Sequence, residues 1–298
     1  MVTPKRSKNR ASIPNISGYT GQYKNVGAIN NKGLEISLNA DVIRTSKFQW
    51  TTDFNIGFNR NRVTELYGGK PELKGLKRLE EGRDMDEWYL REWAGVDPAN
   101  GSPLWYTTDE NGKRTTTDSY NKADRVYCGS AAPKFTGGWM NSFSYKGFTL
   151  TANFDFVYGN LLYNQSRELL DSDGAYADYN SMKLKSGWKR WEKEGDIATH
   201  PKAINGGNKN SNKSSSRYLE KGNYFSLRNL SLGYSIPEKL CGKLGLQRVN
   251  VSCSDDNLFT LTPFSGVSPQ LSDSSTDGYA GTIYPLSRRI VLGLNVSF

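Results

Sequence analysis

Residues able to carry out chemistry are few and scattered along this 298-residue chain. His200 is the only histidine, and no G-x-S-x-G motif supplies a nucleophile for it, so a hydrolase with a Ser-His-Asp triad is poorly supported. Cys128, Cys241 and Cys253 lie far apart without C-x-x-C spacing, which argues against the usual kind of zinc site. We therefore expect no enzyme, no catalytic residue and no cofactor.

One segment, TTDENGKRTTTD at 107–118, partly matches a calcium-binding loop. Its candidate oxygen ligands are Asp109, Asn111 and Asp118, but Thr107 occupies the first ligand position and the last position is not a glutamate. The Asn-Gly pair inside the segment is more simply the tight turn of a β-hairpin. We favour the turn and predict no metal site.

Acidic and amide residues also alternate with apolar ones in segments 34–42, 48–59 and 148–158. Successive side chains of a strand point to opposite faces, so each segment is expected to be a strand with one apolar and one polar face. Hydration of a barrel wall, or pairing with cations of a plug, is the simpler role for the polar face, and lining a solute path is the alternative. The residues concerned are Glu35, Asn39, Asp41, Asp53, Asn55, Asn153 and Asp155.

Strand length and loop length favour an outer-membrane β-barrel over a soluble sheet. The alternating segments run to about ten residues, whereas soluble strands average roughly five or six and membrane-spanning strands need about 9–11. Tight or short connections at 44–47, 144–147 and 237–247 alternate with long ones at about 61–131, 164–216 and 263–286. Periplasmic turns and long outer loops produce this asymmetry in outer-membrane barrels.

Charge and hydropathy argue against a nucleic-acid-binding protein and against a protein with transmembrane helices. The net charge is +9, but no recognition helix or RNA-binding motif accompanies the scattered basic residues, so nucleic acid is not an expected partner. No apolar run of about eighteen residues predicts a transmembrane helix, and no secretory signal follows Met1.

The chain ends in RRIVLGLNVSF, with apolar residues at every second position up to a terminal aromatic. Such an ending resembles the signal read by the barrel-assembly machinery, and the segment is expected to be the closing strand of a barrel. The residues of this predicted signal are Ile290, Leu292, Leu294, Val296 and Phe298.

Several blocks in order resemble the C-terminal third of a SusC/RagA-type TonB-dependent outer-membrane transporter of the Bacteroidetes. They include NVGAINNKGLEISLNADVIRTSKFQWTTDFNIGFNRNRVTEL, GVDPANGSPLWY, GSAAPKFTGGWMNSFSYKGFTLTANFDFVYGNLLYN, RNLSLGYSIPEKL, VNVSCSDDNLFTLTPFSG and YPLSRRIVLGLNVSF. The resemblance runs from about Asn25 to Phe298. It departs from the family at Cys128, where the family usually has an aliphatic residue, and at Ser268-Pro269-Gln270, where the family has an acidic pair.

The resemblance implies an all-β fold: about 7–9 antiparallel transmembrane strands with long extracellular loops, from a barrel of roughly 22 strands. It implies a protein of the cell outer membrane that imports oligosaccharide or peptide with a SusD-like lipoprotein and TonB, amid outer-membrane lipid. Residues 1–24 are expected to be a strandless polar segment of a longer barrel, and 25–298 the C-terminal part of the barrel. A plug domain has no counterpart here, so Met1 is expected to be internal and the fragment not to transport alone.

Aromatic residues in the long connections are candidates for stacking on a ligand. Trp93, Trp105 and Tyr106 suit loop packing and ligand stacking about equally. Trp188 and Trp191 have the three-residue spacing of a short amphipathic helix over 181–195, and packing is favoured for them.

Two other classes of protein stay open. A soluble β-sandwich that binds carbohydrate predicts that the apolar faces form a covered core. An outer-membrane barrel enzyme needs a nucleophile and base inside the barrel, whereas His200 lies in a long connection.

Overall fold

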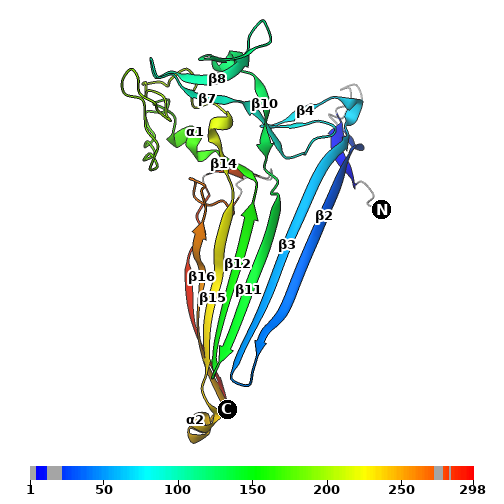
Figure 1. Cartoon of the computed structure of the whole chain (residues 1–298), viewed down its shortest axis with the longest axis vertical. Helices are drawn as coiled ribbons and strands as arrows, with labels where there is room; N and C mark the ends of the chain where they lie inside the picture. Colours follow the sequence, from blue (N-terminus) through cyan, green and yellow to red (C-terminus); the bar gives the residue numbers. More distant parts are fainter. Residues whose placement is uncertain (1–4, 12–21, 272–277, 282) are drawn as a thin grey trace.

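One eight-stranded antiparallel sheet forms the body of the molecule in this computed structural model, which describes residues 5–11, 22–271, 278–281 and 283–298 (Figure 1). In spatial order its strands are β1 (Lys5–Ala11), β2 (Gln22–Arg44), β3 (Phe48–Glu65), β11 (Phe135–Tyr145), β12 (Phe148–Tyr158), β15 (Tyr224–Ser235), β16 (Arg248–Leu261) and β18 (Arg289–Ser297). Every neighbouring pair is antiparallel. The all-β fold class and the expected strand number are confirmed.

The register of the sheet brings the predicted polar residues to one face. Residues directly opposite each other on neighbouring strands share a face. Asp53 is opposite Asn39 on one side and Met140 on the other, and Met140 is opposite Asn153. Glu35, Asp41, Asn55 and Asp155 follow at even spacings from these residues, so they lie on the same face.

The other face of the sheet is apolar and exposed. Leu34, Ile36 and Leu38 of β2 are 59%, 48% and 56% exposed, and Leu292 of β18 is 79% exposed. A soluble sandwich requires a second sheet over such a face. In the described residues the smaller sheets gather at one end of the long strands instead (Figure 1).

Two polar residues on the apolar face of β3 and β11, Thr52 and Asn141, each bind a tryptophan. Thr52 and Asn141 are directly opposite on β3 and β11. The Trp139 indole N–H donates to Thr52 Oγ1 at 2.9 Å, and the Trp50 indole N–H donates to Asn141 Oδ1 at 3.1 Å. Thr52 interrupts the apolar pattern of β3, and its hydroxyl oxygen accepts the hydrogen bond of the Trp139 indole on the same face.

The connections alternate in length as the sequence predicts. The β2–β3 and β11–β12 turns and the β15–β16 connection, which contains helix α2 (Glu238–Lys243), lie near the C-terminus at the lower end in Figure 1. The two-residue β11–β12 turn has Lys146 at φ 47° and Gly147 at φ 87°, both in the left-handed region that a tight hairpin requires. A Cβ at Gly147 would also lie 2.9 Å from the Ser235 carbonyl oxygen.

The long connections pack together at the opposite end. We call them the cap, which comprises the described residues of 66–134, 159–223 and 262–288. Its elements are β4 (Glu72–Lys74), β5 (Lys77–Leu79), β6 (Glu87–Arg91), β7 (Trp93–Val96), β8 (Pro103–Thr108), β9 (Arg114–Thr117), β10 (Arg125–Ser130), β13 (Leu161–Asn164), α1 (Ser166–Leu170), β14 (Leu219–Lys221), β17 (Tyr279–Ala280) and 3-10 turns at Tyr67–Gly69, Tyr120–Lys122 and Ser216–Tyr218.

The main hydrophobic core lies in the cap, not beneath the long sheet. Its buried members are Trp88, Leu90, Ala131, Tyr163 and Tyr218. The Trp88 indole N–H donates to the Leu161 carbonyl at 3.0 Å, which joins the connection after β3 to the connection after β12. The cap is therefore an ordered, packed layer rather than a set of separate loops.

Two expectations are wrong. Residues Lys5–Ala11 form β1 and pair with β2, so this part of 1–24 is not strandless; 1–4 and 12–21 lie outside the described residues. Ladder hydrogen bonds involve backbone groups, so a polar segment without alternation can still form a strand. The expected helix over 181–195 is not formed; the segment is irregular, and Trp191 binds the Pro98 carbonyl in another part of the cap.

None of the helices described is long and apolar enough to cross a membrane.

Candidate functional site

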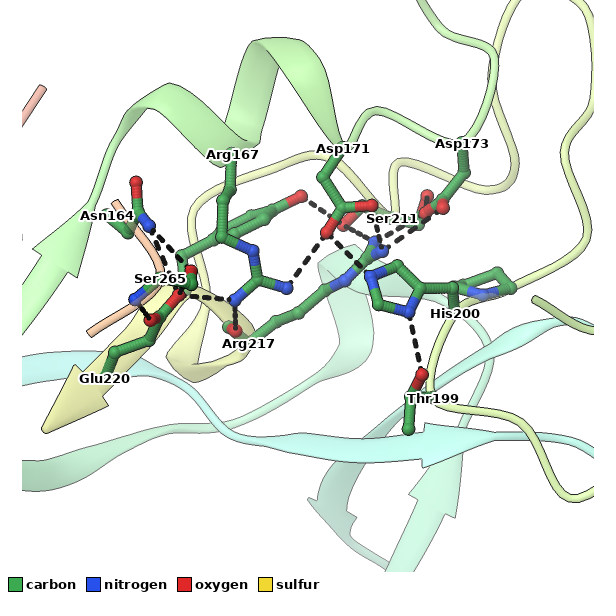
Figure 2. A network of polar contacts seen from close by, with 12 residues as sticks. Asn164, Arg167, Asp171, Asp173, Thr199, His200, Ser211, Arg217, Glu220 and Ser265 are labelled. Carbon is green, nitrogen blue, oxygen red and sulfur yellow. Dashed lines mark hydrogen bonds and ion pairs between the residues drawn. The ribbon is translucent and has the colours of Figure 1, made fainter. Parts of the chain in front are cut away.

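A network of buried ion pairs ties the cap together (Figure 2). Arg167 of α1 donates to Asp171 Oδ2 at 2.9 Å and to Glu220 Oε1 of β14 at 3.0 Å. Arg217 donates to Asp171 Oδ1 at 3.4 Å and also pairs with Asp173. These charge-assisted hydrogen bonds join the segment after β12 to the segment before β15.

Opposite charges in the network balance one another. Asp171 and Asp173 are only 1% and 2% exposed, so neither carboxylate can be solvated by bulk water. Arg190 supplies a further guanidinium, with Nη1 at 2.7 Å from Asp173 Oδ1. Removal of one partner from such a pair leaves a buried charge uncompensated, which costs about 3–5 kcal/mol.

The carboxyl of Asp171 is held in its ionised form. Burial alone would raise its pKa, but the hydrogen bond from His200 and the positive charges of Arg217 and Arg167 outweigh burial. The pKa of Asp171 therefore lies below its ordinary value of 3.8.

His200 is part of the same network and has the partners of a catalytic histidine. Its Nε2 lies 3.0 Å from Asp171 Oδ2, and its Nδ1 lies 2.8 Å from Thr199 Oγ1. However, the Thr199 hydroxyl also accepts the Lys189 N–H at 2.9 Å and donates to the Lys189 carbonyl at 3.1 Å. Asp171 is in turn paired with arginines. The constellation is a cross-link between segments of the cap.

A pocket of about 540 Å³ lies beside the network. Asn164, Arg167 and Ser265 belong to both, so the pocket contains amide, guanidinium and hydroxyl groups within a mostly apolar wall. Concave apolar surfaces with a few fixed polar groups are the usual form of a ligand site. The apolar part of the wall is formed by Leu170, Met182, Val267, Ile283, Tyr284 and Pro285.

The aromatic candidates lie on one small sheet of the cap. Trp105 is fully buried, with its ring 5.6 Å from that of Trp93 and 5.5 Å from that of Tyr120. Trp93 and Tyr106 are half-buried, and a guanidinium lies over each ring, at 5.0 Å for Trp93 and 3.7 Å for Tyr106. Ligand stacking stays a prediction for these residues.

Trp188 and Trp191 pack in the cap, as favoured from their sequence, although without a helix. The Trp191 indole N–H donates to the Pro98 carbonyl at 2.9 Å. The Trp188 ring lies 5.0 Å from that of His200 and 4.4 Å from the Arg167 guanidinium, so it covers one side of the ion-pair network.

The weak calcium-loop candidate forms the turn between β8 and β9. Asp109 Oδ1 accepts the backbone N–H groups of Asn111 at 3.0 Å and Lys113 at 2.8 Å, while Asp118 pairs with Lys209. The hairpin interpretation is confirmed. In the part of the chain that the structure describes, no group of acidic, histidine or cysteine residues is arranged to hold a metal ion.

The remaining predicted residues lie along the long sheet. Asn39 donates to Asp53 across β2 and β3, and Asp155 accepts the Tyr224 hydroxyl at 3.0 Å. Whether these polar-face residues line a solute path stays a prediction. The predicted assembly signal lies on β18 and at the residue after it, where Leu294 is 69% and Phe298 84% exposed; Ile290, Leu292 and Val296 share the face of Leu294.

Most contacts of the ion-pair network cannot be predicted from the sequence. Arg167 and Glu220 are 53 residues apart, and Asp173 and Arg217 are 44 apart. Neither pair has a local spacing that predicts contact. Two local signals exist: the Asp-Ser-Asp run at 171–173, which places two carboxylates close together, and the i,i+4 spacing of Arg167 and Asp171.

Comparisons with known proteins agree with this architecture. No family model matches the chain. It is 29% identical to TonB-dependent receptor P3 of Formosa agariphila over 96% of this chain and 30% of that protein, and 23% identical to TonB-dependent receptor SusC of Bacteroides thetaiotaomicron over 97% of this chain and 28% of that protein. The chain spans about 30% of the length of the curated relatives it matches.

A solved structure has the same fold. The structure of the RagAB peptide transporter superposes with a TM-score of 0.81 at 27% identity, over 97% of this chain and 31% of that chain. The resemblance to SusC/RagA-type TonB-dependent transporters is thereby confirmed.

Proposed function

We propose that this chain forms the C-terminal part of the barrel of a TonB-dependent transporter in the outer membrane, which imports oligosaccharide or peptide. One observation carries the proposal: the long sheet exposes an apolar face, its opposite face is polar, and all its short turns lie at one end. An apolar sheet face of this kind suits lipid, and a polar one suits an aqueous lumen.

The sheet by itself cannot be the whole barrel. In the described residues β1 and β18 each pair on one side only. Backbone groups at an open edge cannot be satisfied by hydrocarbon, so both edges are expected to pair with further strands in the assembled barrel.

The cap is the expected outer surface of the transporter. Its ion-pair network cross-links this layer, and the pocket at Asn164 and Arg167 gives it a concave surface for a nutrient of mixed polarity. Its partners are proposed to be a SusD-like lipoprotein at the outer surface and TonB at the periplasmic side. SusC and RagAB among the similar proteins support this arrangement.

Fractionation of the cells that make the protein tests the proposal. The full-length gene product is expected in the outer-membrane fraction, resistant to alkaline carbonate and released only by detergent. Affinity purification in mild detergent is expected to bring down a lipoprotein. Deletion of the gene should abolish uptake of either fluorescent oligosaccharides or fluorescent peptides, whichever is its substrate. A soluble, detergent-independent product would contradict the proposal.

A further inference from the structure

A cluster of cations lies on the apolar side of the sheet, next to its exposed belt. Lys32 of β2 and Arg60 and Arg62 of β3 share the face of Leu34 and Phe58. Lys32 and Arg60 lie two residues nearer to the cap than this pair, and Arg62 lies four residues nearer. Lys134, just before β11, lines the same cavity as both arginines. We call these four residues the basic rim cluster, and all of them are exposed.

Like charges in this cluster are held together without a counterion. Lys32 is directly opposite Arg60 in the β2–β3 register. Like charges in this arrangement destabilise a sheet. Among the described residues, neither an ion pair nor a side-chain hydrogen bond is found for Lys32, Arg60, Arg62 or Lys134. An anion bound at the cluster would remove the repulsion.

A cavity of about 860 Å³ adjoins the cluster where β3 continues beyond its pairing with β11. Phe58 and Phe135 line it on the side of the apolar belt, with ring centroids 5.9 Å apart. The aliphatic stem of Lys134 is held against the backbone of Gly159, where a Cβ would lie 2.5 Å from Lys134 Cγ. The cavity therefore has aromatic rings on one side and the cations Arg60, Arg62 and Lys134 in its wall.

The other charged groups that line the cavity are Arg83, Asp84 and Glu87, so cations in its wall outnumber carboxylates. Arg83 Nη1 lies 3.1 Å from Glu87 Oε2. Asp84 accepts the Ser130 hydroxyl and the Asp86 N–H, each at 2.8 Å. The free positive charge is thus concentrated on the outward side, at Lys32, Arg60 and Arg62.

We propose that the basic rim cluster binds the phosphate group of a glycolipid in the outer leaflet of the membrane. Guanidinium groups bind phosphate oxygens in a bidentate manner, and the adjacent apolar belt suits the acyl chains of the same lipid. This inference rests on the proposed function, which places the Leu34–Phe58 pair at the edge of the hydrocarbon. The site is separate from the cap pocket and from the polar face of the sheet.

Native mass spectrometry of the full-length protein in neutral detergent tests the inference. Phosphorylated lipid A is the probe, compared with the same lipid after phosphatase treatment and with inorganic phosphate. The wild type is expected to retain phosphorylated lipid A, and the double variant Arg60→Gln with Arg62→Gln to bind it at least roughly tenfold more weakly. The matched control is Lys113→Gln with Lys183→Gln, which removes the same charge from exposed cap positions and should bind as wild type.

Each other outcome overturns the inference. Equal retention of phosphatase-treated lipid would show that acyl chains alone are bound, and displacement by millimolar inorganic phosphate without lipid preference would identify a free-phosphate site. Equal loss in the control variant would indicate unspecific attraction. A membrane-embedded protein that binds no phosphorylated lipid refutes this inference alone, whereas a protein that needs no detergent refutes the proposed function.

Discussion

Asn141 is a polar side chain on the apolar face of the sheet, and its oxygen accepts the Trp50 indole N–H at 3.1 Å. Replacement of Asn141 by Leu leaves that donor without a partner in a setting where lipid cannot replace it. We expect the free energy of unfolding to fall by about 1–3 kcal/mol. Urea titration of the full-length protein in lipid vesicles, followed by tryptophan fluorescence, measures the change.

The double variant Asn141→Leu with Trp50→Phe provides the control. Removal of both polar partners is expected to be nearly neutral, because no donor is then left unsatisfied. A double variant that is less stable than Asn141→Leu by the full cost of Trp50→Phe would contradict the role of this hydrogen bond.

Asp171 makes the cap sensitive to acid. Its pKa is lowered in the folded state, so its contribution to stability is fully present above 3.8 and is lost as the pH falls through the lower, folded-state value. We expect the wild-type cap to become sensitive to pepsin in that range. The Asp171→Asn variant should be about 3 kcal/mol less stable at neutral pH and should lose less on acidification. Equal acid sensitivity of both proteins would assign the effect to other carboxyls.

Among the strands, the sequence predicts those in which apolar and polar residues alternate. The segments 34–42 and 148–158 are strands because every second residue is apolar, and the structure extends the first of them to Gln22–Arg44. The additional residues project beyond the apolar belt, where nothing selects for alternation. Lys5–Ala11 also lacks alternation, so the sequence does not predict it as a strand, although it pairs with β2.

The last strand supplies a prediction about assembly. If β18 and Phe298 form the signal for the barrel-assembly machinery, Phe298→Ala should lower the amount of folded protein in the outer membrane several-fold. Leu244→Ala is the control, because Leu244 is also exposed, at 75%, but lies in the β15–β16 connection. Heat-modifiable migration of outer-membrane samples in gels measures the folded fraction. Equal folded fractions of the two variants would show that Phe298 is not part of the signal.

In the whole molecule, the contacts within the cap are the part that cannot be predicted from the sequence. The ion pairs of Arg167 with Glu220 and of Arg217 with Asp173 join residues that are 53 and 44 positions apart within one long connection, and no local periodicity encodes such contacts. The long sheet differs because the register between strands follows from which face is apolar. Side chains of the polar face could be assigned for this reason, whereas the pocket beside Asn164 could not.

The orientation of the whole sheet in the membrane can be tested at neighbouring residues of β16. Cys253 lies opposite Leu232 and Leu292 on the apolar face, and Ser252 lies on the other face; both are exposed in the sheet. In outer-membrane vesicles a charged maleimide is expected to label Cys253 slowly, because lipid excludes the reagent and disfavours the thiolate. Ser252→Cys, in a Cys253→Ser background, should be labelled at least tenfold faster from the aqueous lumen. Labelling in sodium dodecyl sulfate should equalise the two and exclude intrinsic differences. Rapid labelling of Cys253 in vesicles would mean that the apolar face meets water or protein, and a barrel wall with this face toward lipid would then be wrong.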